Sequence, residues 1–146
     1  MSSARRRIGV NTWVWTSPLT DAALHELAPR IKNWGFDVIE LPVENLGDWS
    51  PAAAADLLTD LGLGATVTLV MGEGRELVAT DPATVGRTQD YLRGVIDAAH
   101  AVGAGVIAGP AYASVGRTWR MSEDERRSCY AELTEHLAPV VEHGMS

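Results

Sequence analysis

The sequence predicts a parallel α/β fold made of four successive strand–helix units. Short apolar runs alternate along the chain with longer segments whose apolar residues recur at three- and four-residue spacing, the period of an amphipathic helix. A glycine closes each helical segment, at positions 35, 62, 103 and 144. Since a tight turn cannot join parallel strands, this alternation predicts parallel pairing through right-handed crossovers.

In the first half, the predicted helices begin at capping residues and end at glycine. The first helix begins at Thr20 and ends before Gly35, in the left-handed position that glycine occupies without steric cost. Ser50 and Pro51 supply an N-cap and a first-turn proline for the second helix, which Gly62 closes. The predicted strands of this half span residues 8–14, 36–41 and 65–71.

The second half repeats the pattern. Asp81 and Pro82 open a third helix, a short strand is expected over 105–109, and Ser122 with Glu125 forms a capping box for the fourth helix. Two prolines, Pro29 and Pro139, fall inside helical patterns. Each removes a backbone hydrogen bond, so we expect it to kink or break its helix, at a cost of about 3 kcal/mol.

Composition excludes several classes of protein. The chain has 146 residues, a formal net charge of −7 and a single cysteine. One cysteine can form neither an internal disulfide nor a multi-cysteine zinc site, and it suits the reducing cytoplasm. The acidic balance argues against nucleic acid and anionic membranes as partners, and no apolar run is long enough to cross a bilayer. The sequence therefore predicts a cytoplasmic protein that binds neither nucleic acid nor a membrane.

Candidate ligand-binding residues follow the predicted strands, because parallel α/β proteins bind ligands at the carboxyl ends of their strands. Trp13 and Trp15 follow the first strand, Glu40 ends the second, and Tyr112 lies in the loop after the fourth. Aromatic rings there can stack on a sugar or base, and a carboxylate can accept hydrogen bonds from hydroxyls. The alternatives are that Trp13 packs in the core and that Glu40 is a buried carboxylate holding loops together.

Other chemistry-bearing residues give weaker indications. Glu44, Glu73, Arg75 and Arg117 are interpreted as solvated loop charges. The turn that begins at Gly72 lacks the third glycine of a dinucleotide-binding loop. All four histidines fall in predicted helices and away from strand ends, so they do not predict a metal site.

The order of these segments resembles the xylose-isomerase-like TIM barrels, and within them the sugar phosphate isomerase/epimerase group that includes D-tagatose and D-psicose 3-epimerases. The resemblance covers essentially the whole chain. It implies that residues 1–146 are the N-terminal half of one TIM-barrel domain, with the fifth strand onward absent. The segments that carry it are Gly9 with Trp13 and Trp15, residues 34–40, Thr80-Asp81-Pro82 leading to Arg87 and Tyr91, and residues 98–109.

This resemblance implies a ketose or sugar phosphate isomerase or epimerase, which moves a proton at a carbon beside a carbonyl. Such enzymes use one divalent metal, usually Mn²⁺, and two glutamates as acid and base. In the family these groups come from strands five to eight, a segment that would lie beyond Ser146, so the resemblance assigns no catalytic or metal-binding residue to this chain. The resemblance assigns contact with the substrate to Trp15, Glu40 and Tyr112, with Trp13 beside them. It also implies that the chain alone is inactive.

A second hypothesis is a non-catalytic half-barrel that binds a small polyol or acts through self-association. Both hypotheses include a partner, because a four-stranded half-barrel leaves two strand edges unpaired and, we expect, an apolar inner face open to water. The expected partner is a second copy or a complementary C-terminal half; the remaining alternative is that the chain is a fragment and needs no separate partner. The identity of the sugar and its phosphorylation stay open.

Overall fold

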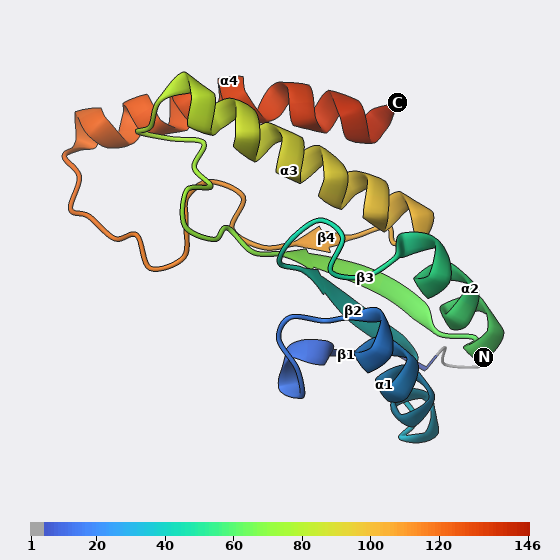
Figure 1. The fold of residues 1–146 in the computed structure, drawn as a ribbon. Coiled ribbons are helices and arrows are strands. Elements are labelled where there is room, and N and C mark those ends of the chain that lie inside the picture. The colour runs from blue at the N-terminus through green and yellow to red at the C-terminus, as the bar shows by residue number, and fades with distance from the viewer. Residues whose placement is uncertain (1–4) are drawn as a thin grey trace.

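A computed structural model of the chain describes residues 5–146 and confirms the parallel fold (Figure 1). One four-stranded parallel sheet has the order β1-β2-β3-β4, and the helices cover one of its faces. The arrangement is half of a (βα)8 barrel. Its elements are β1 (Gly9–Asn11), the 3₁₀ helix η1 (Thr12–Val14), α1 (Asp21–Asn33), β2 (Val38–Val43), α2 (Pro51–Leu61), β3 (Gly64–Leu69), α3 (Pro82–Ala101), β4 (Ile107–Ala108) and α4 (Glu123–Met145).

The first strand is shorter than predicted, and the helices tolerate their prolines. The strand ends at Asn11, because the Asn11 side chain accepts a hydrogen bond from the Trp13 N–H and caps η1 in place of a longer strand. Helices α1 and α4 continue past Pro29 and Pro139, which corrects the expected breaks. Around Pro29, burial of Leu27 and Ile31 on both sides offsets the missing hydrogen bond.

The end of α4 also differs from the prediction. Gly144 lies inside the helix and does not close it, and Ser146 is the C-cap residue. The Ser146 hydroxyl donates to the His143 carbonyl at 2.8 Å, so it satisfies one of the carbonyls that a last helical turn leaves without a partner. The catalytic glutamates that the resemblance places beyond Ser146 stay a prediction.

The hydrophobic core lies between the sheet and the helices. Alternation along β2 directs Ile39, Leu41 and Val43 toward the helices, and all three are buried. Their neighbours on β3, Val67 and Leu69, are buried in the same layer. The helices contribute the remaining part of this core, including Leu24, Leu27, Ile31, Leu58, Leu92 and Val95.

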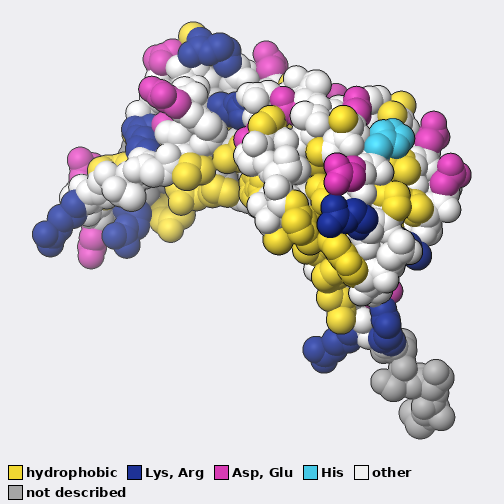
Figure 2. All heavy atoms as spheres, turned by 60° about the horizontal axis from the view of Figure 1, so that its bottom comes forward, with side chains coloured by type: hydrophobic (Ala, Val, Ile, Leu, Met, Phe, Trp, Pro, Cys, Tyr) yellow, Lys and Arg dark blue, Asp and Glu magenta, His cyan; other side chains and the backbone are white. Residues whose placement is uncertain are grey.

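The opposite face of the sheet is not uniformly apolar, which corrects the expectation of an apolar inner face. The strand register places Asn11, Glu40 and Thr66 side by side in one row across β1, β2 and β3. Hydrophobic side chains still gather along the hollowed side of the molecule (Figure 2). The hollow therefore combines a polar centre with apolar surroundings, a composition suited to binding a polar ligand.

Both ends of the sheet are free within residues 5–146, since β1 and β4 each pair on one side only. Beside β4, Val106 and Ile107 are exposed, and Ile107 borders an apolar hollow of about 260 Å³ with Leu137 and Val141 of α4.

None of the described helices is long and apolar enough to cross a membrane.

Two glycines are expected to respond in opposite ways to alanine. Gly86 lies inside α3 with open space where an alanine methyl would stand, so Gly86→Ala should raise the free energy of unfolding by about 0.5–1 kcal/mol. Gly109 has φ +135°, and a Cβ there would lie 2.6 Å from the Leu69 carbonyl oxygen, so Gly109→Ala should lower it by about 1–3 kcal/mol. Urea denaturation measures both, and equal effects would contradict these two environments.

Candidate functional site

The polar centre of the hollow is a hydrogen-bonded pair formed by Asn11, the last residue of β1, and Glu40. Glu40 lies inside β2, which continues to Val43, so it does not end the second strand as the sequence predicts. Asn11 Nδ2 donates to Glu40 Oε2 over 2.6 Å, and Asn11 Oδ1 accepts from the Trp13 backbone N–H at 2.8 Å. Both side chains line a hollow of about 290 Å³ with Thr66. Because Glu40 Oε1 accepts no hydrogen bond from the described residues, it is free to accept one from a hydroxyl group.

Trp13 is held beside this pair by a second carboxylate. Its indole Nε1 donates to Glu44 Oε1 over 2.8 Å, and the Ser17 hydroxyl donates to the same oxygen at 2.6 Å. Glu44, interpreted from sequence as a solvated loop charge, instead connects the β1 loop to the end of β2. The indole remains partly exposed, but Trp13 is not among the residues that line the hollow at Glu40.

Trp15 takes a different direction from Trp13. Its ring stacks on Trp34 with the centroids 5.3 Å apart, and the Arg30 guanidinium lies 5.2 Å from the Trp34 ring centroid. Trp34 directly follows α1, so this aromatic stack lies against that helix. One face of the Trp15 ring is thereby occupied, and its role in binding substrate stays a prediction.

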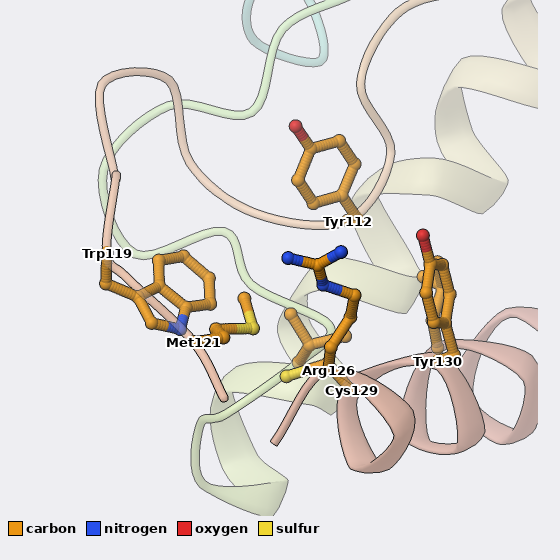
Figure 3. A pocket seen from close by; sticks show the side chains of 8 residues that line it. Tyr112, Trp119, Met121, Arg126, Cys129 and Tyr130 are labelled. Atoms are coloured by element: carbon orange, nitrogen blue, oxygen red, sulfur yellow. The ribbon is translucent and has the colours of Figure 1, made fainter. Parts of the chain in front are cut away.

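Tyr112 is separated from the Asn11–Glu40 pair. It lines a pocket of about 380 Å³ together with Trp119 and residues of α4 (Figure 3), and this pocket shares no lining residue with the hollow at Glu40. The four site residues predicted from sequence therefore do not form one cluster. Glu40 and Trp13 are near Asn11, Trp15 is stacked on Trp34, and Tyr112 lines the pocket beside α4. Only Glu40 and Trp13 are linked, through Asn11, which bonds both the Glu40 carboxylate and the Trp13 backbone N–H. Tyr112 as a residue of the same site stays a prediction.

Arg75, another residue interpreted as a solvated charge, holds the β2 and β3 loops together. Its Nη1 donates to the Glu44 carbonyl at 2.6 Å and to the Val70 carbonyl at 3.0 Å, and its guanidinium lies 3.7 Å from the Tyr91 ring centroid. The Tyr91 hydroxyl donates to the Val43 carbonyl at 2.5 Å and accepts from the Val70 N–H at 3.2 Å. Burial raises the pKa of Tyr91, so the hydroxyl keeps its proton as a donor.

A buried ion pair, which sequence reasoning missed, joins the loops after β3 and β4. Glu76 accepts from the Ser114 hydroxyl at 2.5 Å through Oε1, and Arg117 Nη1 lies 2.5 Å from Oε2. Burial favours a raised pKa, but the hydrogen bonds from Ser114 and Arg117 outweigh it and hold the pKa of Glu76 below its ordinary value. The guanidinium also lies 4.5 Å from the Trp119 ring centroid. Arg117 is therefore a structural cation rather than a solvated one.

The metal implied by the family resemblance has no evident ligand set among the residues that the structure describes. Within residues 5–146, no three His, Cys, Asp or Glu side chains come together in a way that could hold an ion. Glu40 is paired with an amide and Glu76 with a guanidinium, and neither group is shared with another carboxylate or a histidine. These residues do not fit a divalent cation, so no chemical step is assigned to one here.

Comparison with known proteins finds sequence similarity to sugar epimerases. The chain is 25% identical over 134 residues to the L-ribulose 3-epimerase of Methylomonas sp. (strain DH-1), a match that covers 92% of the chain and 47% of that protein. It is 24% identical over 109 residues to the ketose 3-epimerase of Arthrobacter globiformis, covering 75% of the chain and 38% of that protein. No family model matches the sequence.

Solved structures agree with these relatives. A D-allulose 3-epimerase from Methylomonas sp. superposes with a TM-score of 0.81 at 25% identity, covering 96% of this chain and 49% of that one. The chain has the half-barrel fold of the ketose 3-epimerases. The resemblance to the xylose-isomerase-like sugar isomerase/epimerase family is thereby confirmed.

The half-barrel spans about half the length of the curated relatives that it matches. A second superposition, with a TM-score of 0.80 at 23% identity, is to a Methylomonas D-allulose 3-epimerase in complex with D-allulose, and that likeness shows the fold. The D-psicose 3-epimerase of Clostridium cellulolyticum H10, 14% identical with a TM-score of 0.74, shares the fold as well.

Proposed function

We propose that this half-barrel supplies the sugar-binding part of a ketose isomerase or epimerase site. The observation that carries the proposal is the Asn11–Glu40 pair in its hollow. Trp13 is joined to this pair through its backbone N–H, which donates to Asn11, and its partly exposed ring is held by Glu44. A carboxylate oxygen and a primary amide accept and donate hydrogen bonds to neighbouring hydroxyls, and the indole offers an apolar surface to a sugar carbon face. The similarity to ketose 3-epimerases supports a ketose as the ligand.

In this proposal the chain binds and orients the sugar but does not carry out the proton transfer. Catalytic acid and base groups, and the divalent cation with its ligands, are assigned to a partner half-barrel. That partner is a second copy or a complementary C-terminal half, which would pair with the free edges of β1 and β4 and cover the apolar hollow beside Ile107. We place this assembly in the cytoplasm, since the chain has a single cysteine.

The binding part of the proposal is tested by calorimetric titration of the chain with D-allulose, D-fructose and L-ribulose. Glu40→Gln should weaken binding about tenfold or more, because a hydrogen bond to a charged acceptor contributes about 1.5–3 kcal/mol. Glu73→Gln is the matched control, since Glu73 is an exposed loop glutamate after β3 and should bind normally. Failure of all three sugars to bind, alone and with a complementary half-barrel, would overturn the proposal.

The assembly part is tested separately by light scattering on the purified chain. We expect a mass above that of one chain, because the unpaired strand edges and the apolar hollow favour association. A stable monomer that also fails to bind a complementary half would contradict it. Ketose binding without turnover in every assembly would favour the non-catalytic half-barrel.

A further inference from the structure

We propose that the pocket between the β4–α4 loop and α4 is a second binding site, which takes a small organic carboxylate with a planar apolar body. This aromatic pocket is formed by Tyr112, Trp119, Met121, Arg126, Cys129 and Tyr130 (Figure 3). Its volume of about 380 Å³ lies in the range of small-molecule sites. The inference does not depend on the proposed sugar function.

The walls of the pocket favour a flat apolar body. Tyr112 and Trp119 come from the loop and Tyr130 from α4, and all three rings are exposed at the pocket in the described structure. Val78 and Leu133 complete an apolar lining. Aromatic rings stack on planar ligands in offset or edge-on arrangements, so a ring-bearing ligand fits this lining better than a polyol.

The polar groups of the pocket favour an anion. Figure 3 shows the Arg126 guanidinium below the Tyr112 ring, with Trp119 on one side and Tyr130 on the other. Within residues 5–146 Arg126 makes no ion pair, whereas Arg117 and Arg127 pair with Glu76 and Asp124. The lining contains no carboxylate.

The other polar groups around Arg126 strengthen this preference. The hydroxyls of Tyr112 and Tyr130 and the indole N–H of Trp119 have no hydrogen-bond partner among the described residues, so they remain available as donors. Two of the three acidic side chains in the first turn of α4 have other partners: Asp124 pairs with Arg127 and Glu125 bonds Ser122. The third, Glu123, makes no ion pair with Arg126 in the part of the chain that the structure describes and does not line the pocket. A guanidinium matches a carboxylate with two parallel hydrogen bonds, which makes a carboxylate the expected head group.

The test is calorimetric titration of the whole chain with phenylacetate and indole-3-acetate. We expect at least one to bind, Arg126→Gln to weaken it about tenfold or more, and the uncharged phenylacetamide to bind about tenfold more weakly. Arg120→Gln is the matched control, because Arg120 is an exposed arginine of the same loop that does not line the pocket. The Arg120→Gln variant should bind the two carboxylates with the affinity of the unmodified chain.

Four outcomes would overturn the inference: no binding of either carboxylate, equal binding of phenylacetate and phenylacetamide, equal affinity of the Arg126→Gln variant, or inorganic phosphate binding as tightly. Arg126 is exposed, so its replacement should leave the fold intact, and circular dichroism checks this. Glu40→Gln should leave carboxylate binding unchanged, which distinguishes failure here from failure of the proposed sugar site.

Discussion

Replacing Arg117 with methionine is expected to lower the free energy of unfolding by about 3 kcal/mol, measured by urea denaturation near neutral pH. The variant leaves the Glu76 carboxylate buried without its cation, since the Glu76 side chain is only 10% exposed. It also removes the hydrogen bond that Arg117 donates to the Ala79 carbonyl at 3.0 Å. The value lies at the low end for a broken buried pair because Arg117 itself is 31% exposed.

Arg93→Met is the matched control for this prediction. Arg93 is 32% exposed, nearly the same as Arg117, but its partner Asp90 is 79% exposed. Breaking such a surface pair should cost less than about 1 kcal/mol. If the two variants lost similar stability, burial of Glu76 would not be the cause.

The same ion pair predicts how stability depends on pH. The pKa of Glu76 is lowered from its ordinary value of 4.5, so its contribution is fully present above pH 4.5 and is lost as the pH falls through the lowered pKa. In Arg117→Met the pKa should rise, because burial is no longer opposed by the guanidinium. The stability difference between the two proteins should therefore shrink below pH 4.5, and a constant difference would contradict the assignment.

Tyr91→Phe is expected to lower the free energy of unfolding by about 2–3 kcal/mol. The substitution keeps the ring under the Arg75 guanidinium but leaves the Val43 carbonyl and the Val70 N–H without their partner, at about 1–3 kcal/mol for each buried group. Urea denaturation measures the loss. Tyr130→Phe is the control, since that hydroxyl is exposed and has no partner in the described chain, and it should change stability by less than about 0.5 kcal/mol.

Local signals along the chain predicted the order of strands and helices. The N-caps Thr20, Ser50, Asp81 and Ser122 all lie where the sequence places them. Each depends on hydrogen bonds and backbone conformations within a few residues, so the spacing of residue types is sufficient to find it. Parallel pairing followed, because strands that alternate with helices typically pair in parallel through right-handed crossovers.

Partnerships between distant loops could not be predicted in this way. Arg75 and Arg117 look like solvated charges in their own segments, yet each is bonded to groups about thirty or forty residues away. Trp15 follows the first strand as expected, but its ring stacks on Trp34, and Tyr112 faces α4. No local spacing encodes these contacts.

The sequence by itself determined four parallel strand–helix units, because hydrophobic period, caps and turn residues act over short distances. The half-barrel followed from the resemblance to the xylose-isomerase-like barrels, and Glu40, expected at the end of the second strand, lies inside β2. Only the tertiary structure decided which of the candidate site residues meet. Strand register places Asn11 against Glu40, and loop packing separates them from Tyr112. Side-chain neighbours across a sheet are fixed by pairing of segments far apart in the chain, and this pairing forms only when the whole core folds.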